Sequence, residues 1–300
     1  MSSPPVRLVV FGCGYVGGAL ARAARDRGLQ VTALTRNTAK AAELAAEGIA
    51  TVVGDLASSD WHERIPGDAD WVANTVSASE PTVEGYRRSY VEGLRSILTW
   101  AGKGSRPVGT LCYTSSTGVY PQGGGAVVDE SAATADAGPT GRVLVEAEDV
   151  LRHAPASAVG RWFILRLAGI YGPGRHHLLD SLRNGAGELP GEESFRLNLA
   201  HRDDIVSALL AAFGAPPTVR SDTFNVSDDA PATRGEVAAW LAARLGRPVP
   251  RFGGARASVR KAGGSAPDRV IRSRRIREAL GWTPAHADFR SGYDAILRQL

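Results

Sequence analysis

Short apolar runs alternate with stretches of helical spacing along the first half of the chain. The runs are rich in β-branched residues, which is typical of strands buried on both faces. The other stretches place apolar residues three and four positions apart, which predicts amphipathic helices. The predicted strands are residues 6–11, 30–34, 50–53, 71–75, 108–113 and 162–167. The predicted helices between them are residues 17–27, 39–47, 83–100 and 142–151.

A glycine-containing turn separates the first predicted strand from the first predicted helix. It consists of Gly12, Cys13, Gly14, Tyr15, Val16 and Gly17. In a strand–turn–helix unit, Gly12 permits the tight turn, Gly14 lets the backbone approach a pyrophosphate, and Gly17 lets the helix pack closely on the strand. The helix N-terminus adds free N–H groups and a partial positive charge. This context predicts a dinucleotide site; the alternative is a turn that merely connects two elements.

The alternation and the turn together predict an α/β fold, a doubly wound parallel sheet of the Rossmann type. After about residue 170 the alternation breaks down. The remaining predicted elements are a short strand at 222–226 and helices near 234–245 and 273–280. We expect residues 1–170 to form a dinucleotide-binding Rossmann domain. Residues 171–300 are expected to form mainly a smaller substrate-binding cap, with some segments returning to the Rossmann core and the ligand between cap and sheet.

The end of the second predicted strand bears on the choice of dinucleotide. An acidic residue about 20 positions past the glycine turn holds the ribose 2′-hydroxyl of NAD, whereas an arginine suits the 2′-phosphate of NADP. Here the chain reads Thr35-Arg36-Asn37, without a carboxylate. Arg36 can pair with a phosphate in bidentate geometry. We therefore predict NADP as the cofactor, with NAD as the second option; an exposed arginine that only starts a helix is the alternative.

Asp55 and Leu56 follow the third predicted strand. A carboxylate at this place can accept a hydrogen bond from the adenine amino group while the leucine packs on the ring. The alternative is that Asp55 caps the following turn, as Asp commonly does after Gly. Both residues are candidate cofactor contacts.

The composition is that of an ordinary globular protein, with 300 residues of which 43% are hydrophobic and 22% charged. No apolar stretch reaches the ~18–20 residues of a membrane span, and the first residues lack the apolar core of a signal peptide. Cys13 and Cys112 lie in or beside apolar strands. We expect no disulfide framework, no membrane partner and a cytoplasmic protein.

The net charge of +4 raises the question of a nucleic-acid partner. Arginine is dispersed along the chain and is dense only at 256–277, where no aromatic residues are interleaved. We expect no nucleic-acid partner and interpret the charge as a solvated surface or as a complement to an anionic substrate or cofactor. The adjacent His176 and His177 do not have metal-ligand spacing, and no metal site is predicted.

Several segments, taken in order, resemble one family. They are GCGYVG at 12–17, GDL at 54–56, YTSSTGVY at 113–120, LRLAGIYGPGR at 165–175, HRDDI at 201–205, FNVSD at 224–228 and LGW at 280–282. The chain resembles an extended short-chain dehydrogenase/reductase of the epimerase–dehydratase type, specifically its atypical members with a shortened glycine turn. The resemblance covers almost the whole chain. It implies a nicotinamide cofactor and a small-molecule substrate that is sugar-like or a nucleotide sugar.

The resemblance also implies where catalytic residues should lie. In the family a Ser hydrogen-bonds the substrate oxygen, a Tyr exchanges a proton with it, and a Lys lowers the Tyr pKa and holds the nicotinamide ribose. The serine position falls on Ser116, but the Tyr and Lys positions fall on Thr140 and Leu144. None of the lysines follows a tyrosine by four; they are Lys40, Lys103 and Lys261. The usual acid–base step, typically worth ~10²–10⁴ in rate, is therefore not supplied by these positions.

Two smaller departures concern the same chemistry. Pro121 stands where many relatives have Gly, and Tyr90 stands where an asparagine organises a proton relay in the enzymes that the chain resembles. Tyr120 and Tyr171 are candidate replacement proton donors by neighbourhood, with aromatic packing as the alternative.

Arg175 and Arg202 are candidate contacts for an anionic group of the substrate, or else members of structural ion pairs.

The predicted cofactor site and the missing acid–base pair lead to two hypotheses for the function. The first is a divergent enzyme, an oxidoreductase or epimerase that uses NADP, because the cofactor carries the hydride chemistry and the protein need only orient it. The second is an NADP-binding redox sensor or partner-binding module without turnover, since fold alone does not settle function.

Oligomeric state is a further expectation from the resemblance. Relatives often dimerise through the two helices predicted here at 83–100 and 142–151, so a homodimer is one arrangement of this chain. Apolar side chains would supply that face or would pack on their own sheet; they are Val83, Tyr86, Tyr90, Leu94 and Ile97.

Overall fold

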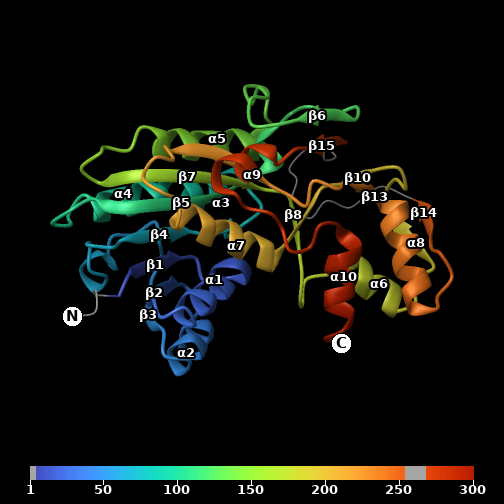
Figure 1. Cartoon of the computed structure of the whole chain (residues 1–300), viewed down its shortest axis with the longest axis horizontal. Coiled ribbons are helices and arrows are strands. Elements are labelled where there is room, and N and C mark those ends of the chain that lie inside the picture. The colour runs from blue at the N-terminus through green and yellow to red at the C-terminus, as the bar shows by residue number, and fades with distance from the viewer. Residues whose placement is uncertain (1–4, 254–267) are drawn as a thin grey trace.

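A parallel sheet of seven strands forms the centre of the computed structural model, which describes residues 5–253 and 268–300 (Figure 1). The strands are β1 (Arg7–Phe11), β2 (Gln30–Thr35), β3 (Ala50–Val53), β4 (Trp71–Asn74), β5 (Val108–Ser116), β7 (Val159–Leu167) and β12 (Asp222–Val226). Their order is β12-β7-β5-β4-β1-β2-β3. The direction of winding reverses between β1 and β4, which is where doubly wound sheets bind ligands. The predicted α/β fold is confirmed.

The seventh strand comes from the second half of the chain. β12 pairs in parallel with β7, with Phe224 opposite Leu165, so a segment that follows residue 170 completes the central sheet. Part of the arginine-rich stretch 256–277, and Lys261, lie outside the described residues. The boundary at residue 170 between a Rossmann domain and a cap stays a prediction.

Helices cover both faces of the sheet (Figure 1). One face packs α1 (Tyr15–Arg25), α2 (Thr38–Ala46) and α7 (Arg202–Phe213) into one hydrophobic cluster. The other packs α4 (Gly93–Ala101) and α5 (Pro139–Arg152) into a second cluster. Helix α7 was not among the predicted helices. Most of its residues are buried, so its sequence has no clear polar face for periodicity to detect.

The predicted helix at 83–100 is one helical stretch of changing pitch. It runs from α3 (Val83–Tyr86) through a π-helical segment (Arg87–Glu92) into α4. Such π-helical turns occur frequently at functional sites. Within this stretch, Leu94 and Ile97 are fully buried against the sheet. Those two side chains are therefore core residues rather than a dimer face.

A second group of helices lies beside the sheet, at the right of Figure 1. It contains α6 (His177–Arg183), α8 (Arg234–Leu245) and α10 (Phe289–Leu297), which share a separate hydrophobic cluster around Leu241 and Phe289. Helix α8 has the predicted bounds, whereas α6 and α10 were not predicted. The predicted helix near 273–280 is α9 (Arg274–Leu280). Two-stranded pairs lie outside the central sheet; they are β8 (Gly169–Tyr171) with β11 (Leu199–His201), β9 (Glu188–Pro190) with β14 (Arg251–Gly253), β10 (Arg196–Leu197) with β13 (Ala232–Thr233), and β6 (Ala126–Val128) with β15 (Arg269–Ile271).

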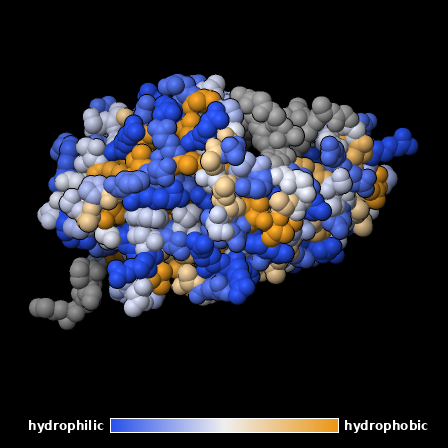
Figure 2. All heavy atoms as spheres, turned by 90° about the horizontal axis from the view of Figure 1, so that it is seen from above, coloured by the Kyte–Doolittle hydropathy of each residue, from blue (hydrophilic) through white to orange (hydrophobic). Residues whose placement is uncertain are grey.

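Among the described residues, no helix has both the length and the apolar character needed to cross a bilayer. On the face shown in Figure 2, hydrophobic side chains occur in small groups among hydrophilic ones.

The two helices of the predicted dimer face are linked within the chain. An ion pair joins the π-helical segment to α5, with Arg87 Nη1 2.7 Å from Glu146 Oε1. The homodimer stays a prediction.

Candidate functional site

Packing and backbone geometry explain two of the three glycines in the turn between β1 and α1. Gly12 has φ +86°, and a Cβ there would lie 2.6 Å from the Val76 nitrogen. A Cβ on Gly17 would lie 2.3 Å from both the Gly12 carbonyl oxygen and Thr75 Oγ1. A Cβ on Gly14 would meet nothing within 4 Å. Gly12 and Gly17 therefore fix the turn, while Gly14 leaves open space beside the start of α1.

That open space belongs to a cavity of about 880 Å³ at the carboxyl ends of the central strands. It gathers most of the predicted site residues. Those lining it are Gly12, Cys13, Gly14, Tyr15, Val16, Arg36, Asp55, Leu56, Ser116, Thr140, Leu144 and Arg175. Among the described residues, three predicted site residues do not line the cavity; they are Gly17, Tyr171 and Arg202. Its volume is within the range of small-molecule and cofactor sites.

One end of the cavity carries Arg36 and Asp55. Arg36 is exposed at the rim, while the neighbouring Asn37 accepts the Lys40 N–H at 2.9 Å and so caps α2. Asp55 accepts the Ala57 N–H at 3.1 Å, which is the predicted turn-capping role. Its other oxygen lies 2.5 Å from Arg88 Nη2. Burial raises the pKa of Asp55, but the hydrogen bonds from Arg88 and Ala57 outweigh it and hold that pKa below its ordinary value.

The other end of the cavity carries Ser116, Thr140 and Leu144. Ser116 ends β5, and its Oγ accepts the Gly118 N–H at 3.0 Å, which fixes the side chain and leaves its own O–H to donate. Thr140 lies in the first turn of α5. Leu144 is buried in a small apolar cluster with Tyr120 and Ile271. The side chain at the lysine position therefore contributes to packing.

Tyr120 lines the cavity, but its hydroxyl is engaged elsewhere. The hydroxyl donates to Asn225 Oδ1 at 2.8 Å and accepts from Arg166 Nη1 at 2.8 Å. Burial raises the pKa of Tyr120 despite the nearby Arg166 charge. Tyr171 is buried outside the cavity, against the rings of Tyr293 and His201. These surroundings favour the packing interpretation of both tyrosines.

A buried ionic network beneath the cavity was not predicted. Glu148 of α5 is fully buried and accepts two hydrogen bonds from Arg166, at 2.9 and 2.6 Å. Ser115 Oγ donates to the same carboxylate at 2.7 Å, and Arg152 Nη2 does so at 2.7 Å. Glu148 lies in the predicted helix 142–151 and Arg166 lies inside the predicted strand 162–167, and no local pattern signalled that the two side chains meet.

Tyr15 connects the glycine turn to the segment that contains Arg175. Its hydroxyl donates to the Pro173 carbonyl at 2.9 Å. The guanidinium groups of Arg175 and Arg202 lie 5.6 and 5.4 Å from the centre of its ring. Burial raises the pKa of Tyr15 to about 12. Arg202 pairs with Asp203 at 2.7 Å, which is the structural alternative for that arginine.

Tyr90 stands at the family's asparagine position. Its hydroxyl accepts a hydrogen bond from the Ala78 N–H at 3.2 Å.

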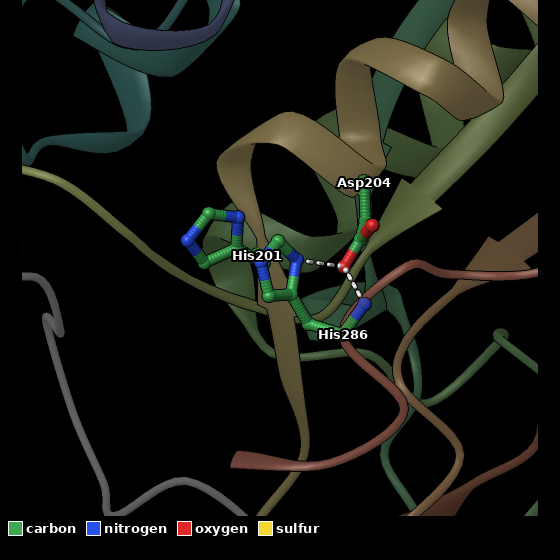
Figure 3. A group of neighbouring side chains, drawn as sticks. All are labelled: His201, Asp204 and His286. Atoms are coloured by element: carbon green, nitrogen blue, oxygen red, sulfur yellow. Dashed lines mark hydrogen bonds and ion pairs between the residues drawn. The ribbon is translucent and has the colours of Figure 1, made fainter. Parts of the chain in front are cut away.

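His201, Asp204 and His286 lie close together outside the cavity (Figure 3). His286 Nδ1 lies 2.9 Å from Asp204 Oδ2, and the same carboxylate accepts the Ala285 N–H at 2.7 Å. The two imidazole rings face each other, with centres 3.9 Å apart and planes tilted by 36°. One possible metal-ligand atom from each of the three residues lies within 4.8 Å of the other two. Asp204 thus holds the His286 segment to α7.

Comparison with known proteins agrees with the fold. Residues 8–227 match the model of the NAD dependent epimerase/dehydratase family. Protein YeeZ of Escherichia coli strain K12 is 28% identical over 290 residues, covering 94% of this chain and 97% of YeeZ. The 3-diazoavenalumate denitrifying reductase of a Streptomyces species is 28% identical over 317 residues, covering 96% and 99%. Among solved structures, MoeE5 in complex with UDP-glucose and NAD has a TM-score of 0.80 at 22% identity, covering 98% of this chain and 99% of MoeE5.

Proposed function

The chain belongs to the NAD dependent epimerase/dehydratase family, and from this premise we propose that it is a divergent oxidoreductase or epimerase that binds NADP. The observation that carries the proposal is the single cavity that joins the glycine turn to Ser116. Gly14 supports it further, because the space that a Cβ there would fill is open to a pyrophosphate. The cofactor would lie along this cavity, on the N–H groups of the first turn of α1.

Arg36 supports NADP over NAD. Its side chain is exposed at the rim beside Asn37, and the end of β2 offers no carboxylate for a ribose 2′-hydroxyl. A guanidinium pairs with a phosphate through two parallel hydrogen bonds. Asp55 and Leu56 would face the adenine. The free thiols of Cys13 and Cys112 suit a reducing, cytoplasmic location.

The substitutions at the acid–base positions restrict the reaction. When bound, the reduced cofactor supplies a hydride. Ser116 would orient the substrate by donating to an oxygen, whereas Thr140 and the buried Leu144 supply no proton and no charge. A substrate that needs no proton from the protein suits such a site. An aryl diazonium ion is of this kind, because it accepts a hydride at carbon and releases N₂ with no proton required; the name of the Streptomyces relative describes a reductase of a diazo compound.

Anaerobic turnover tests the proposal. Purified protein is incubated with NADPH and, separately, an aryl diazonium salt, UDP-glucose and a set of ketones, and NADPH oxidation is followed against protein-free controls. We expect turnover with at least one substrate, and at least a tenfold lower kcat/KM in Ser116→Ala. Turnover that Ser116→Ala does not alter would remove Ser116 from the proposed site.

The second candidate function is an NADP-binding module without turnover. The burial of Leu144 in an apolar cluster favours this function, because the side chain at the family's lysine position contributes to packing. NADPH binding is measured by the quenching of protein fluorescence. Compared with NADPH oxidation, this measurement separates the two functions. Tight binding with no oxidation across the whole panel supports the module, and oxidation above the protein-free rate supports the enzyme.

A further inference from the structure

Arg269 reaches the cavity from a distant part of the chain. Strand β15 pairs in parallel with β6, and this pairing carries Arg269 to the loop that follows Ser116. Its side chain lines the cavity yet is only 7% exposed. Nη2 donates to the Thr117 carbonyl at 2.6 Å, and Nη1 donates to the Tyr120 carbonyl. The guanidinium is therefore fixed one residue away from the predicted substrate-binding serine.

The charge of Arg269 is not neutralised by a carboxylate as that of the buried Arg166 is. Arg166 is paired with Glu148 through two hydrogen bonds. Within residues 5–253 and 268–300, no carboxylate pairs with Arg269, which is held by backbone carbonyls and lies 5.9 Å from the centre of the Tyr120 ring. Burial lowers its pKa. Buried arginines are almost always paired, because an unpaired buried charge is strongly destabilising.

The remaining hydrogen-bonding capacity of Arg269 suits an anion. A guanidinium has five N–H donors in a planar fork, and the bonds to the carbonyls of Thr117, Tyr120 and Gln122 occupy three of them. The nearby Leu144 has an aliphatic side chain that packs in the cluster of Tyr120 and Ile271 and carries no charge. An oxyanion entering the cavity would thus meet a preoriented cation with free donors.

We propose that Arg269 binds an anionic group of the substrate, a carboxylate or a phosphate, and so sets the substrate class of this site. The inference rests on the proposed function, because it assigns the substrate end of the same cavity. It implies that a neutral analogue of the substrate binds through its remaining contacts only.

Calorimetry with two matched pairs of probes tests the assignment: trans-cinnamate against cinnamamide, and UDP against uridine, in the presence of NADP⁺. We expect one anion to bind wild-type protein at least tenfold more tightly than its neutral partner. Cinnamate preference identifies a carboxylate, and UDP preference a phosphate. Arg269→Gln should remove that preference without changing the binding of the neutral partner, and Arg269→Lys should keep part of it.

Arg272→Gln is the matched control, because Arg272 follows the same strand but is half-exposed and pairs with Asp229 instead of lining the cavity. It should keep the full preference. Equal binding of anion and neutral partner in both pairs, or an equal loss for both in Arg269→Gln, overturns the proposal.

Two further arrangements keep the test decisive. If Arg269→Gln does not fold, crystals of the wild-type protein with the preferred anion decide, since its oxygen should lie within about 3.2 Å of the guanidinium. An anion bound elsewhere overturns the assignment. Repeating the titrations without NADP⁺, and titrating NADP⁺ alone, separates the proposals. Arg269-dependent anion binding without NADP⁺ binding refutes only the proposed function. NADP⁺ binding without Arg269-dependent anion binding refutes only this inference.

Discussion

Glu148 and Arg166 form a bidentate ion pair under the cavity floor, with Nε 2.9 Å from Oε1 and Nη2 2.6 Å from Oε2. Their backbones belong to different layers, Glu148 to α5 and Arg166 to β7. Ser115 precedes Ser116 in β5 and donates to the same carboxylate. The pair therefore ties the helix, the sheet and the strand end that carries Ser116 into one unit.

Loss of the Glu148 charge should destabilise the protein strongly. Glu148→Gln leaves Arg166 buried without its counter-ion, and breaking a buried pair in this way typically costs about 3–5 kcal/mol. Urea unfolding followed by circular dichroism measures the change in the free energy of unfolding. Glu278→Gln is the control, because Glu278 forms an exposed pair with Arg274 on α9 and should have little effect. Equal stability of the two variants would contradict the structural role of the pair.

The glycine turn allows stability and binding to be separated. Gly17→Ala places a Cβ 2.3 Å from Thr75 Oγ1 and the Gly12 carbonyl, so we expect a clear loss of thermal stability. Gly14→Ala has open space, so we expect a folded protein of near-normal stability whose NADPH affinity falls at least tenfold.

Thermal unfolding and NADPH fluorescence titration measure the two effects. Gly187→Ala is the control, because Gly187 also has no neighbour near its Cβ position and lies outside the cavity lining. Normal NADPH binding by Gly14→Ala would argue that the cofactor does not approach this turn.

Arg36 should decide between the two nicotinamide cofactors. Removing a bidentate phosphate contact by Arg36→Gln is expected to weaken NADP⁺ binding by about tenfold or more, with little change for NAD⁺. Calorimetric titration of each cofactor gives the ratio of affinities. Arg27→Gln, an exposed arginine outside the cavity lining, should leave both affinities unchanged. A parallel loss for NAD⁺ and NADP⁺ would remove the 2′-phosphate assignment.

Asp228 should make stability depend on pH. Burial raises its pKa to about 7, although the Ala230 N–H bonds its carboxylate. A carboxyl group whose folded pKa is raised binds more protons in the folded state, so stability falls as pH rises from about 4 to 7. Asp228→Asn removes this dependence and should be the more stable protein at pH 8, by at most about 4 kcal/mol.

The difference between Asp228→Asn and wild type should vanish below about pH 3, where Asp228 is protonated in both the folded and the unfolded state. Urea unfolding at a series of pH values measures it. Asp136→Asn, at an exposed carboxyl group, is the control and should follow the wild-type curve. A pH-independent difference would show that the Asp228 carboxyl group does not titrate between pH 4 and 7.

Elements with a local residue pattern could be predicted from the amino-acid sequence alone. All seven strands of the sheet, the glycine turn and helix α8 could be predicted as elements, because burial on two faces, glycine spacing and helical periodicity appear in neighbouring residues. Helix α7 was not predicted, because it is buried on most sides and its sequence therefore lacks that periodicity. The position of Ser116 followed from the family resemblance, as did the absence of the tyrosine and the lysine.

The contacts between residues far apart in the chain became known only from the three-dimensional fold. It placed β12 beside β7, buried Leu144 against Ile271, paired Glu148 with Arg166, and brought Arg269 to the loop after Ser116. Periodicity shows that a side chain is buried but not what buries it. Partners separated by up to 152 residues in the chain are chosen by strand order and packing, which no local pattern contains.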